Sequence, residues 1–97
     1  EQIESAVYEN ESINKSVELK EQQISELKKL TQNNKIIDGM PCDTNNYFVC
    51  TLSTNKKLHF SISSDGDCLS TDDHVYMLKT KKAAYAREFV KTLVAQH

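Results

Sequence analysis

Two cysteines and two histidines in the second half of the chain are of the types that bind zinc. Cys50, His59, Cys68 and His74 are separated by nine, nine and six residues. In zinc motifs the ligands come in closely spaced pairs, and none of these four residues forms such a pair. Cys50 and His59 are also predicted on opposite faces of a hairpin, so we expect buried cysteines, surface histidines and neither metal nor other cofactor.

The same region holds the residue types of a nucleophilic site. Cys68 and His74 lie near Asp72 and Asp73, but no recognised motif accompanies them. Nucleophilic catalysis needs a base held against the nucleophile and a concave site for the substrate, and a small domain offers little concave volume. With two glycines in the whole chain, a phosphate-binding Gly-rich loop is excluded. We predict a protein that is not an enzyme, and an enzyme built on Cys68 and His74 is the alternative.

Two groups of charged residues are candidates for binding a partner. The first is Glu18, Leu19 and Lys20, in which the leucine is predicted at an outward-facing position of a helix and repeated on both chains of a dimer. The second is the basic face of the last predicted helix. The predicted partner-binding residues are Glu18, Leu19, Lys20, Lys15, Lys81, Lys82 and Arg87.

A heptad pattern in the first third of the chain predicts the element that displays the first group. Residues 1–34 contain no Pro or Gly, and we expect one continuous helix there. Asn10 at a seam position favours a parallel, in-register coiled-coil dimer. The predicted dimer seam consists of Ile3, Ala6, Asn10, Ile13, Val17, Ile24 and Leu27, with Lys20, Thr31 and Asn34 at the remaining a and d positions.

The rest of the chain predicts a small sheet and a second helix. Residues 47–53 and 57–63 are rich in aromatic and β-branched types and form a predicted antiparallel hairpin. Short strand pieces follow at 68–69 and 74–78, and residues 81–96 are an amphipathic helix that covers the sheet, with Thr80 as its N-cap. The predicted fold is α+β, with a coiled-coil stalk at 1–35 and a small head at 36–97, assembled as a parallel homodimer.

Composition excludes several classes of protein. The formal net charge of −2 and pI near 5.9 argue against a general nucleic-acid binder. No apolar run approaches the roughly 18 residues that cross a bilayer, and no signal peptide is expected. The three cysteines are an odd number without a Cys-x-x-Cys pair, so we expect reduced thiols in the cytosol or nucleus.

One motif interval resembles a known family. Glu18-Leu19-Lys20-Glu21 is followed, after eighteen residues counted from Lys20, by Gly39-Met40-Pro41-Cys42-Asp43. A strand ending in YFVCTLS, a second containing LHFSIS and a helix with REFVKTLV come next. This order is similar to the C-terminal domain of the mitotic-arrest-deficient coiled-coil scaffold of the spindle assembly checkpoint. The resemblance implies that the head at residues 36–97 is of the RWD-like type. At residue 18 that family has Arg, and Glu18 reverses the charge.

The resemblance implies a non-enzymatic kinetochore scaffold that dimerises and docks a budding-uninhibited-type checkpoint kinase. It implies that a HORMA-domain checkpoint protein is held through the wider chain, and that the protein works in the nucleus, at the nuclear envelope and at kinetochores, without binding membrane or nucleic acid. Phosphate on the kinase would be met by Lys20, Lys15 or the basic helix. The alternative is a structural coiled-coil subunit of the spindle-pole-component or monopolin type, which pairs through its head with a different chain.

Overall fold

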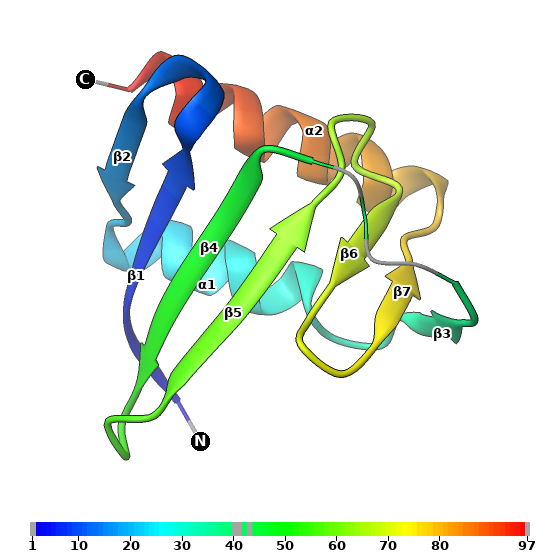
Figure 1. The fold of residues 1–97 in the computed structure, drawn as a ribbon, viewed down its shortest axis with the longest axis horizontal. Coiled ribbons are helices and arrows are strands. Elements are labelled where there is room, and N and C mark those ends of the chain that lie inside the picture. Colours follow the sequence, from blue (N-terminus) through cyan, green and yellow to red (C-terminus); the bar gives the residue numbers. More distant parts are fainter. Residues whose placement is uncertain (1, 40–41, 43, 97) are drawn as a thin grey trace.

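The computed structural model describes residues 2–39, 42 and 44–96, which form one seven-stranded antiparallel sheet and two α-helices. Figure 1 shows both helices on one side of the sheet. The elements are β1 (Ile3–Asn10), the 3-10 turn η1 (Glu11–Ile13), β2 (Lys15–Glu18), α1 (Glu21–Leu30), β3 (Lys35–Ile37), β4 (Asn46–Leu52), β5 (Lys57–Ile62), β6 (Cys68–Ser70), β7 (Val75–Met77) and α2 (Thr80–Ala95).

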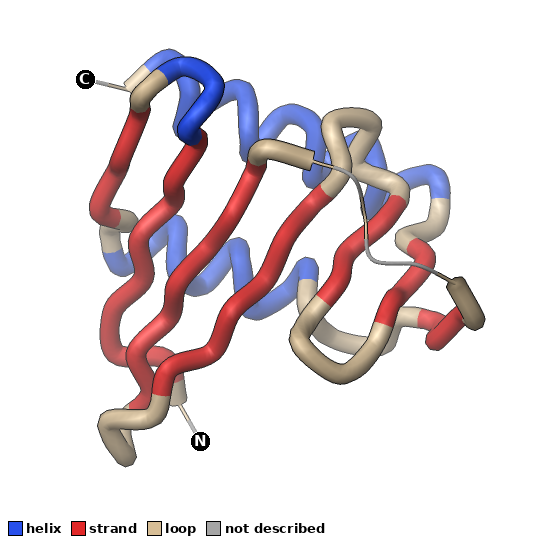
Figure 2. The backbone as a smooth tube through the Cα atoms, viewed as in Figure 1, coloured by secondary structure: helices blue, strands red, loops and turns tan. Residues whose placement is uncertain are grey.

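The strands lie in the order β2-β1-β4-β5-β6-β7-β3, so strands far apart in the sequence are neighbours in the sheet. The N-terminal hairpin of β1 and β2 joins through β1 to β4, and β3 pairs with β7 at the other end (Figure 2). Strands from both sides of the boundary predicted after residue 35 therefore lie in one sheet and contribute to one core.

The continuous helix predicted over residues 1–34 is wrong. The segment forms two antiparallel strands and then a helix of ten residues. In β1 the side chains of Ala6, Tyr8 and Asn10 are buried on one face, while their neighbours point to the other. This alternation has the period of a strand, and over so short a stretch it coexists with an apparent heptad.

The reversal between β1 and β2 depends on two asparagines. The Asn10 side chain accepts a hydrogen bond from the Ser12 backbone N–H at 3.1 Å, which starts the 3-10 turn. Asn14 then takes a left-handed conformation with φ of 51°, which asparagine tolerates better than most residues. The two residues turn the chain back on itself where a coiled coil needs an uninterrupted helix.

The parallel coiled-coil homodimer is wrong for the same reason. Most of the predicted seam is buried, but inside a single chain: Ala6, Asn10, Val17, Ile24 and Leu27 lie in the core, and Ile3 packs against its edge. Ile13 is 50% exposed at the end of η1. The pattern identified residues that need burial, and the sheet and helices of the same chain provide it.

Helix α1 retains the part of the predicted helix with the strongest local signals. Its straight-chain residues favour helix, and the Lys20 backbone N–H donates to the Gln23 side chain at 2.8 Å across the first turn. After α1 the chain turns at two asparagines: Asn33 has φ of 58°, and the Asn34 amide donates to the Leu30 carbonyl at 2.7 Å.

The hairpin of β4 and β5 and the last helix are confirmed. The register pairs Phe48 with Phe60, and the side chains of Phe60 and Ile62 are buried. Helix α2 covers this face, where Phe89 stacks on Phe48 with ring centroids 6.1 Å apart. Its N-cap is Lys79, one residue before the predicted Thr80.

A buried polar network closes one end of the core. The Tyr8 hydroxyl donates to the Asn46 side-chain oxygen at 2.6 Å, and the Asn10 amide donates to the Tyr8 hydroxyl at 3.1 Å. The Asn46 amide and the Thr44 hydroxyl both donate to the Ile62 carbonyl. Among the described residues every buried side-chain nitrogen and oxygen has a hydrogen-bond partner, so this network costs the fold little.

The turn between β5 and β6 lies directly against α2. Gly66 is buried there with φ of 77°, and a Cβ at this position would clash with the Ala83 carbonyl oxygen. The Arg87 side chain holds the same turn by donating to the Asp65 carbonyl at 2.9 Å. Gly66 is thus required by both its backbone conformation and the close approach of the helix.

We expect Gly66→Ala to lower the free energy of unfolding by about 2–4 kcal/mol, because it combines left-handed strain with overpacking. Chemical denaturation followed by circular dichroism measures the loss. Asp65→Ala, at an exposed side chain of the same turn, is the matched control and should cost less than about 0.5 kcal/mol. Equal stabilities for the two variants would contradict the close packing of this turn on α2.

Candidate functional site

The sheet face opposite the helices is the candidate site. We call its uncovered part over β2, β1, β4 and β5 the open face. Register places its side chains in three rows across these strands. The rows are Glu18, Val7, Val49 and His59, then Ser16, Glu9, Tyr47 and Ser61, and finally Ser5, Thr51 and Lys57.

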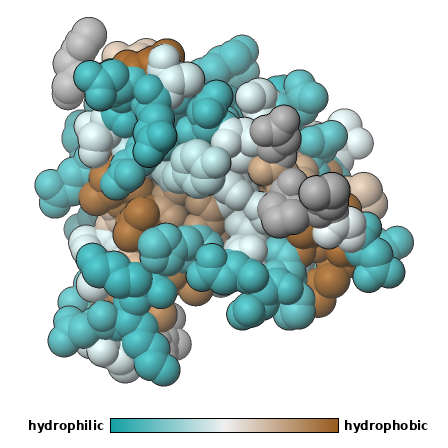
Figure 3. All heavy atoms as spheres, viewed as in Figure 1, coloured by the Kyte–Doolittle hydropathy of each residue, from teal (hydrophilic) through white to brown (hydrophobic). Residues whose placement is uncertain are grey.

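The centre of the open face is apolar. Val7 and Val49 are paired across β1 and β4, and both are only half-buried. Tyr47, which follows on the same side of β4, is 46% exposed. Figure 3 looks at this side of the molecule and shows apolar side chains gathered over β1 and β4 with hydrophilic ones around them. The described part of the chain therefore leaves adjoining apolar side chains accessible to a partner.

The two sides of the open face differ in charge. Glu9 and Glu18 lie on β1 and β2, whereas Lys57 and His59 lie on β5. All four side chains are exposed. A groove of about 500 Å³ adjoins the acidic side and is lined by Glu4, Glu18 and Glu21 among others. Charge thus changes sign across the apolar centre, from acidic at one sheet edge to basic toward the middle of the sheet.

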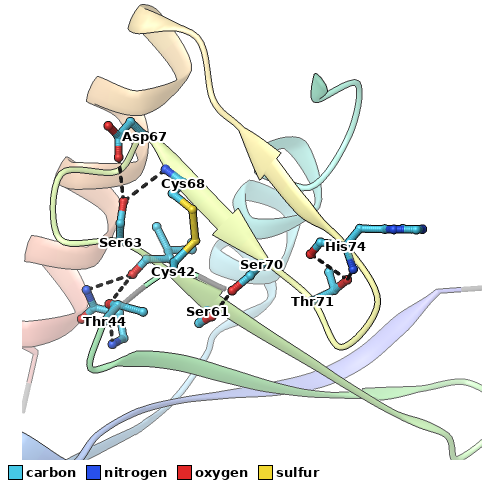
Figure 4. The surroundings of a disulfide bond; sticks show 11 residues. Cys42, Thr44, Ser61, Ser63, Asp67, Cys68, Ser70, Thr71 and His74 are labelled. Carbon is cyan, nitrogen blue, oxygen red and sulfur yellow. Dashed lines mark hydrogen bonds between the residues drawn. A yellow bond between two sulfur atoms is a disulfide. The ribbon is translucent and has the colours of Figure 1, made fainter. Parts of the chain in front are cut away.

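The same side of the sheet is closed where the second row continues over β6 and β7, although Met77 at the end of β7 is 43% exposed. Ser70 and Val75 continue the second row and are buried, with Ser61 and Ser70 joined through their hydroxyls at 2.5 Å. Cys68, two residues before Ser70, forms a disulfide with Cys42 of the β3–β4 connection (Figure 4). Cys42 is thus tied to β6, and a continuous uncovered part of the sheet extends over the four neighbouring strands β2, β1, β4 and β5.

The disulfide corrects the expectation of three reduced cysteines. Cys42 and Cys68 are bonded, with their Cα atoms 6.1 Å apart, and Cys50 is the free thiol. Cys50 is buried on the helix side of β4, and burial raises the pKa of its thiol to about 11. The thiolate is therefore scarce at neutral pH, and Cys50 is a poor nucleophile.

The alternative chemistry built on Cys68 and His74 has no support in this geometry. With its sulfur in the disulfide, Cys68 has no thiol to be activated, and His74 lies in the exposed turn between β6 and β7. Cys50 and His59 are on opposite faces of the sheet, as predicted. Within residues 2–39, 42 and 44–96, no three His, Cys, Asp or Glu side chains group as metal ligands.

The predicted docking group around Leu19 is not assembled. Leu19 is 6% exposed within the core, and its backbone N–H donates to the Ala6 carbonyl at 2.9 Å. The expectation of an exposed leucine was therefore wrong. Glu18 points to the open face, and Lys20 is the exposed N-cap of α1. Lys15 is half-buried at the start of β2.

The basic residues of the last helix are partly used inside the fold. The Lys82 ammonium donates to the Gln32 carbonyl and to the Asn34 side chain at 2.5 and 2.9 Å, which ties α2 to the end of α1. Arg87 holds the β5–β6 turn, as described above. Lys81 is exposed. Two of these three side chains therefore brace the helix against neighbouring turns.

Sequence reasoning missed the residues that make up the open face, apart from Glu18. Val49, His59 and Lys57 carried a usable signal, because they alternate with core residues in the predicted hairpin. Val7 and Glu9 alternate with core residues in the same way, but this signal is visible only if residues 3–10 are interpreted as a strand. Their placement beside β4 follows from pairing across some forty residues, which local pattern does not reveal.

No protein-family model matches the chain, and no curated protein or solved structure matches it. Neither helix in the described ranges has the length and apolar character needed to cross a membrane.

The cysteine assignment predicts a definite thiol count. With Ellman's reagent the native protein should show no fast-reacting thiol, because Cys50 is buried with a raised pKa and the other two are bonded. The count should rise to one per chain in guanidinium and to three after reduction in guanidinium. Three reactive thiols in unreduced, unfolded protein would contradict the disulfide.

The disulfide should also contribute measurably to stability. It closes a loop with a sequence separation of 26 residues, and in the chain-entropy model such a loop stabilises the folded state by about 3.5 kcal/mol. Reduction should therefore lower the denaturation midpoint. The double variant Cys42→Ser with Cys68→Ser should show the lowered midpoint already and should not respond to reductant, which controls for other effects of the reagent.

Proposed function

We propose that this chain is a non-enzymatic protein-binding domain and that the open face is its binding surface. The single observation that carries the proposal is the row Glu18, Val7, Val49 and His59. It has an apolar centre with an acidic group at one end and a hydrogen-bonding imidazole ring at the other. Flat surfaces of this kind, with an apolar centre and a polar rim, suit protein partners better than small ligands.

The side chains of the open face limit the kind of partner that can bind there. A partner would bury Val7, Val49 and the Tyr47 ring under apolar side chains of its own. It would place positive charge or N–H donors opposite Glu9 and Glu18, and a carboxylate opposite Lys57 and His59. Complementary charge of this kind orients a partner and suppresses wrong ones, while the apolar centre provides most of the affinity.

The states of the cysteines support binding over catalysis. The thiol that sequence reasoning considered as a nucleophile is consumed in the Cys42–Cys68 disulfide, and the remaining thiol at Cys50 is buried. A disulfide also persists best in an oxidising compartment. It therefore favours a location outside the cytosol and nucleus, in place of the nuclear location that the resemblance implied.

Docking of a checkpoint kinase at kinetochores stays a prediction from the resemblance. Its physical basis was a leucine exposed on a coiled coil, and Leu19 is in the core. The binding surface proposed here does not depend on it. Pairing of the chain with a different subunit, the alternative drawn from the resemblance, is compatible with the open face if that subunit has the complementary charges.

Site-specific photo-crosslinking tests the proposal. A benzophenone amino acid replaces Tyr47 on the open face in cells that make the protein naturally, and Tyr85 on α2 serves as the matched control. The two tyrosines are 46% and 43% exposed, so they differ in location rather than accessibility. We expect a discrete covalent adduct from position 47 and none from position 85.

A second variant makes the crosslink specific to the surface. Val7→Lys with Val49→Lys replaces the apolar centre by charge at half-buried positions and should leave the circular dichroism spectrum unchanged. The adduct from position 47 should then fall by about tenfold or more, because burying unpaired charge is costly. An adduct of unchanged yield, or no adduct from position 47, would overturn the proposal.

A further inference from the structure

Resting on the proposed function, we infer that the partner of the open face is a second copy of this chain. The two copies pack sheet to sheet about a two-fold axis that runs parallel to the strands between β1 and β4. Such an axis keeps the position along the strands and reverses the order across them. A residue on one side of the axis in the first copy is then opposite the residue that lies equally far from the axis, on its other side, in the same row of the second copy.

The first row is self-complementary under this operation. Read across the strands it is Glu18, Val7, Val49 and His59, with the axis between the two valines. Rotation places Val7 opposite Val49 of the second copy and Glu18 opposite His59. The two valines of one copy are therefore buried against the two valines of the other. The Glu18 carboxylate contacts the His59 imidazole of the other copy twice, once on each side of the axis.

The neighbouring rows follow the same rule. Glu9 falls opposite the exposed Tyr47 of the second copy, where a phenol can donate to a carboxylate. Ser5 falls opposite Thr51, and Ser16 opposite Ser61. Among the residues that the register pairs directly, the rotation places no like-charged side chains opposite each other.

The third row extends the charge match to the sheet edge. Thr51 falls opposite Ser5 of the second copy, and Lys57 lies one strand further from the axis on β5. Lys57 therefore falls beyond Ser5 of the second copy, near the residues that follow β2. The groove that opens there is lined by Glu4, Glu18 and Glu21 and also by Lys28. The lysine of each copy thus meets a groove of the other in which carboxylates outnumber ammonium groups. This is the charge complementarity that favours a second copy over an unrelated protein.

The closed part of the sheet does not obstruct this arrangement. β6 lies one strand beyond β5, and the axis carries it past the β2 edge of the second copy, where no strand faces it. The Cys42–Cys68 disulfide therefore lies beside the dimer contact. Pairing through the sheet edges is less favourable, because β2 and β3 have four and three residues and present few backbone groups.

The size of the surface predicts a weak dimer. Four strands and about five residues along each give a contact on the order of 20 by 17 Å. This is less than the roughly 800 Å² per partner of a standard interface. We therefore expect a dissociation constant on the order of 100 µM, with monomer and dimer in fast exchange.

Sedimentation equilibrium of the purified chain from about 10 µM to 1 mM measures this association. His59→Glu places two carboxylates opposite each other at both symmetry-related positions and should weaken the dimer about tenfold or more. His74→Glu introduces the same charge at an exposed histidine outside the open face and is the matched control. It should leave the dissociation constant unchanged within about twofold.

Charge reversal tests the two-fold register itself. Adding Glu18→Lys to His59→Glu restores an opposite pair on each side of the axis, so the double variant should recover the original dissociation constant within about threefold. An equimolar mixture of the two single variants should form a heterodimer more tightly than either variant forms its own dimer. Only contact between residue 18 of one copy and residue 59 of the other predicts both results.

Two outcomes would overturn the inference. One is a chain that stays monomeric at 1 mM, and the other is a dimer indifferent to His59→Glu and to Val7→Lys. Either result leaves the proposed binding function to be decided separately by the mass of the crosslink at position 47. An adduct of twice the chain mass agrees with a second copy, whereas a face-dependent adduct of another mass retains the function and rejects this partner.

Discussion

The antiparallel pairing of β1 with β4 is the constraint on which the rest of the structure depends. It joins the N-terminal hairpin, which is local in sequence, to β4, which begins some forty residues after β1 begins. Its register puts Ala6, Tyr8, Phe48 and Cys50 on the helix side, where α1 and α2 bury them. A slip of one residue would move all four to the opposite face, so the core determines which residues form the open face.

Asn10 is a buried polar residue both in the sequence-based prediction and in the structure, but its role differs between the two. At a coiled-coil seam position, a buried asparagine selects a parallel partner. Here Asn10 is 8% exposed and bonds to Tyr8, to Asn46 and to the turn that follows it. The same need to satisfy a buried amide is met within the chain, and it specifies the β1–β4 register instead of an oligomer.

The accuracy of sequence reasoning follows the range of the interactions involved. The hairpin of β4 and β5 was predictable because strict alternation and a local turn determine it, and α2 because its apolar stripe continues over several turns. Residues 3–18 contain short apolar repeats that fit either period, and only the distant β4 strand decides between them. The Cys42–Cys68 bond was inaccessible for a similar reason, since an odd cysteine count leaves several pairings open.

Exposed valines alone would be weak evidence for a binding surface, because β-branched residues favour strands wherever they lie. The arrangement around Val7 and Val49 is what distinguishes the open face. In this two-layer fold the helices cover only one side of the sheet. On the opposite side, Cys42 of the β3–β4 connection is bonded to Cys68 of β6. The strands left uncovered carry acidic groups on one side of the valines and basic groups on the other. A surface that had only to remain soluble would gain nothing from separating the signs in this way, since mixed charges serve equally well. The separation is useful when another surface must be held in one orientation, and it is the reason to regard this side of the sheet as a site.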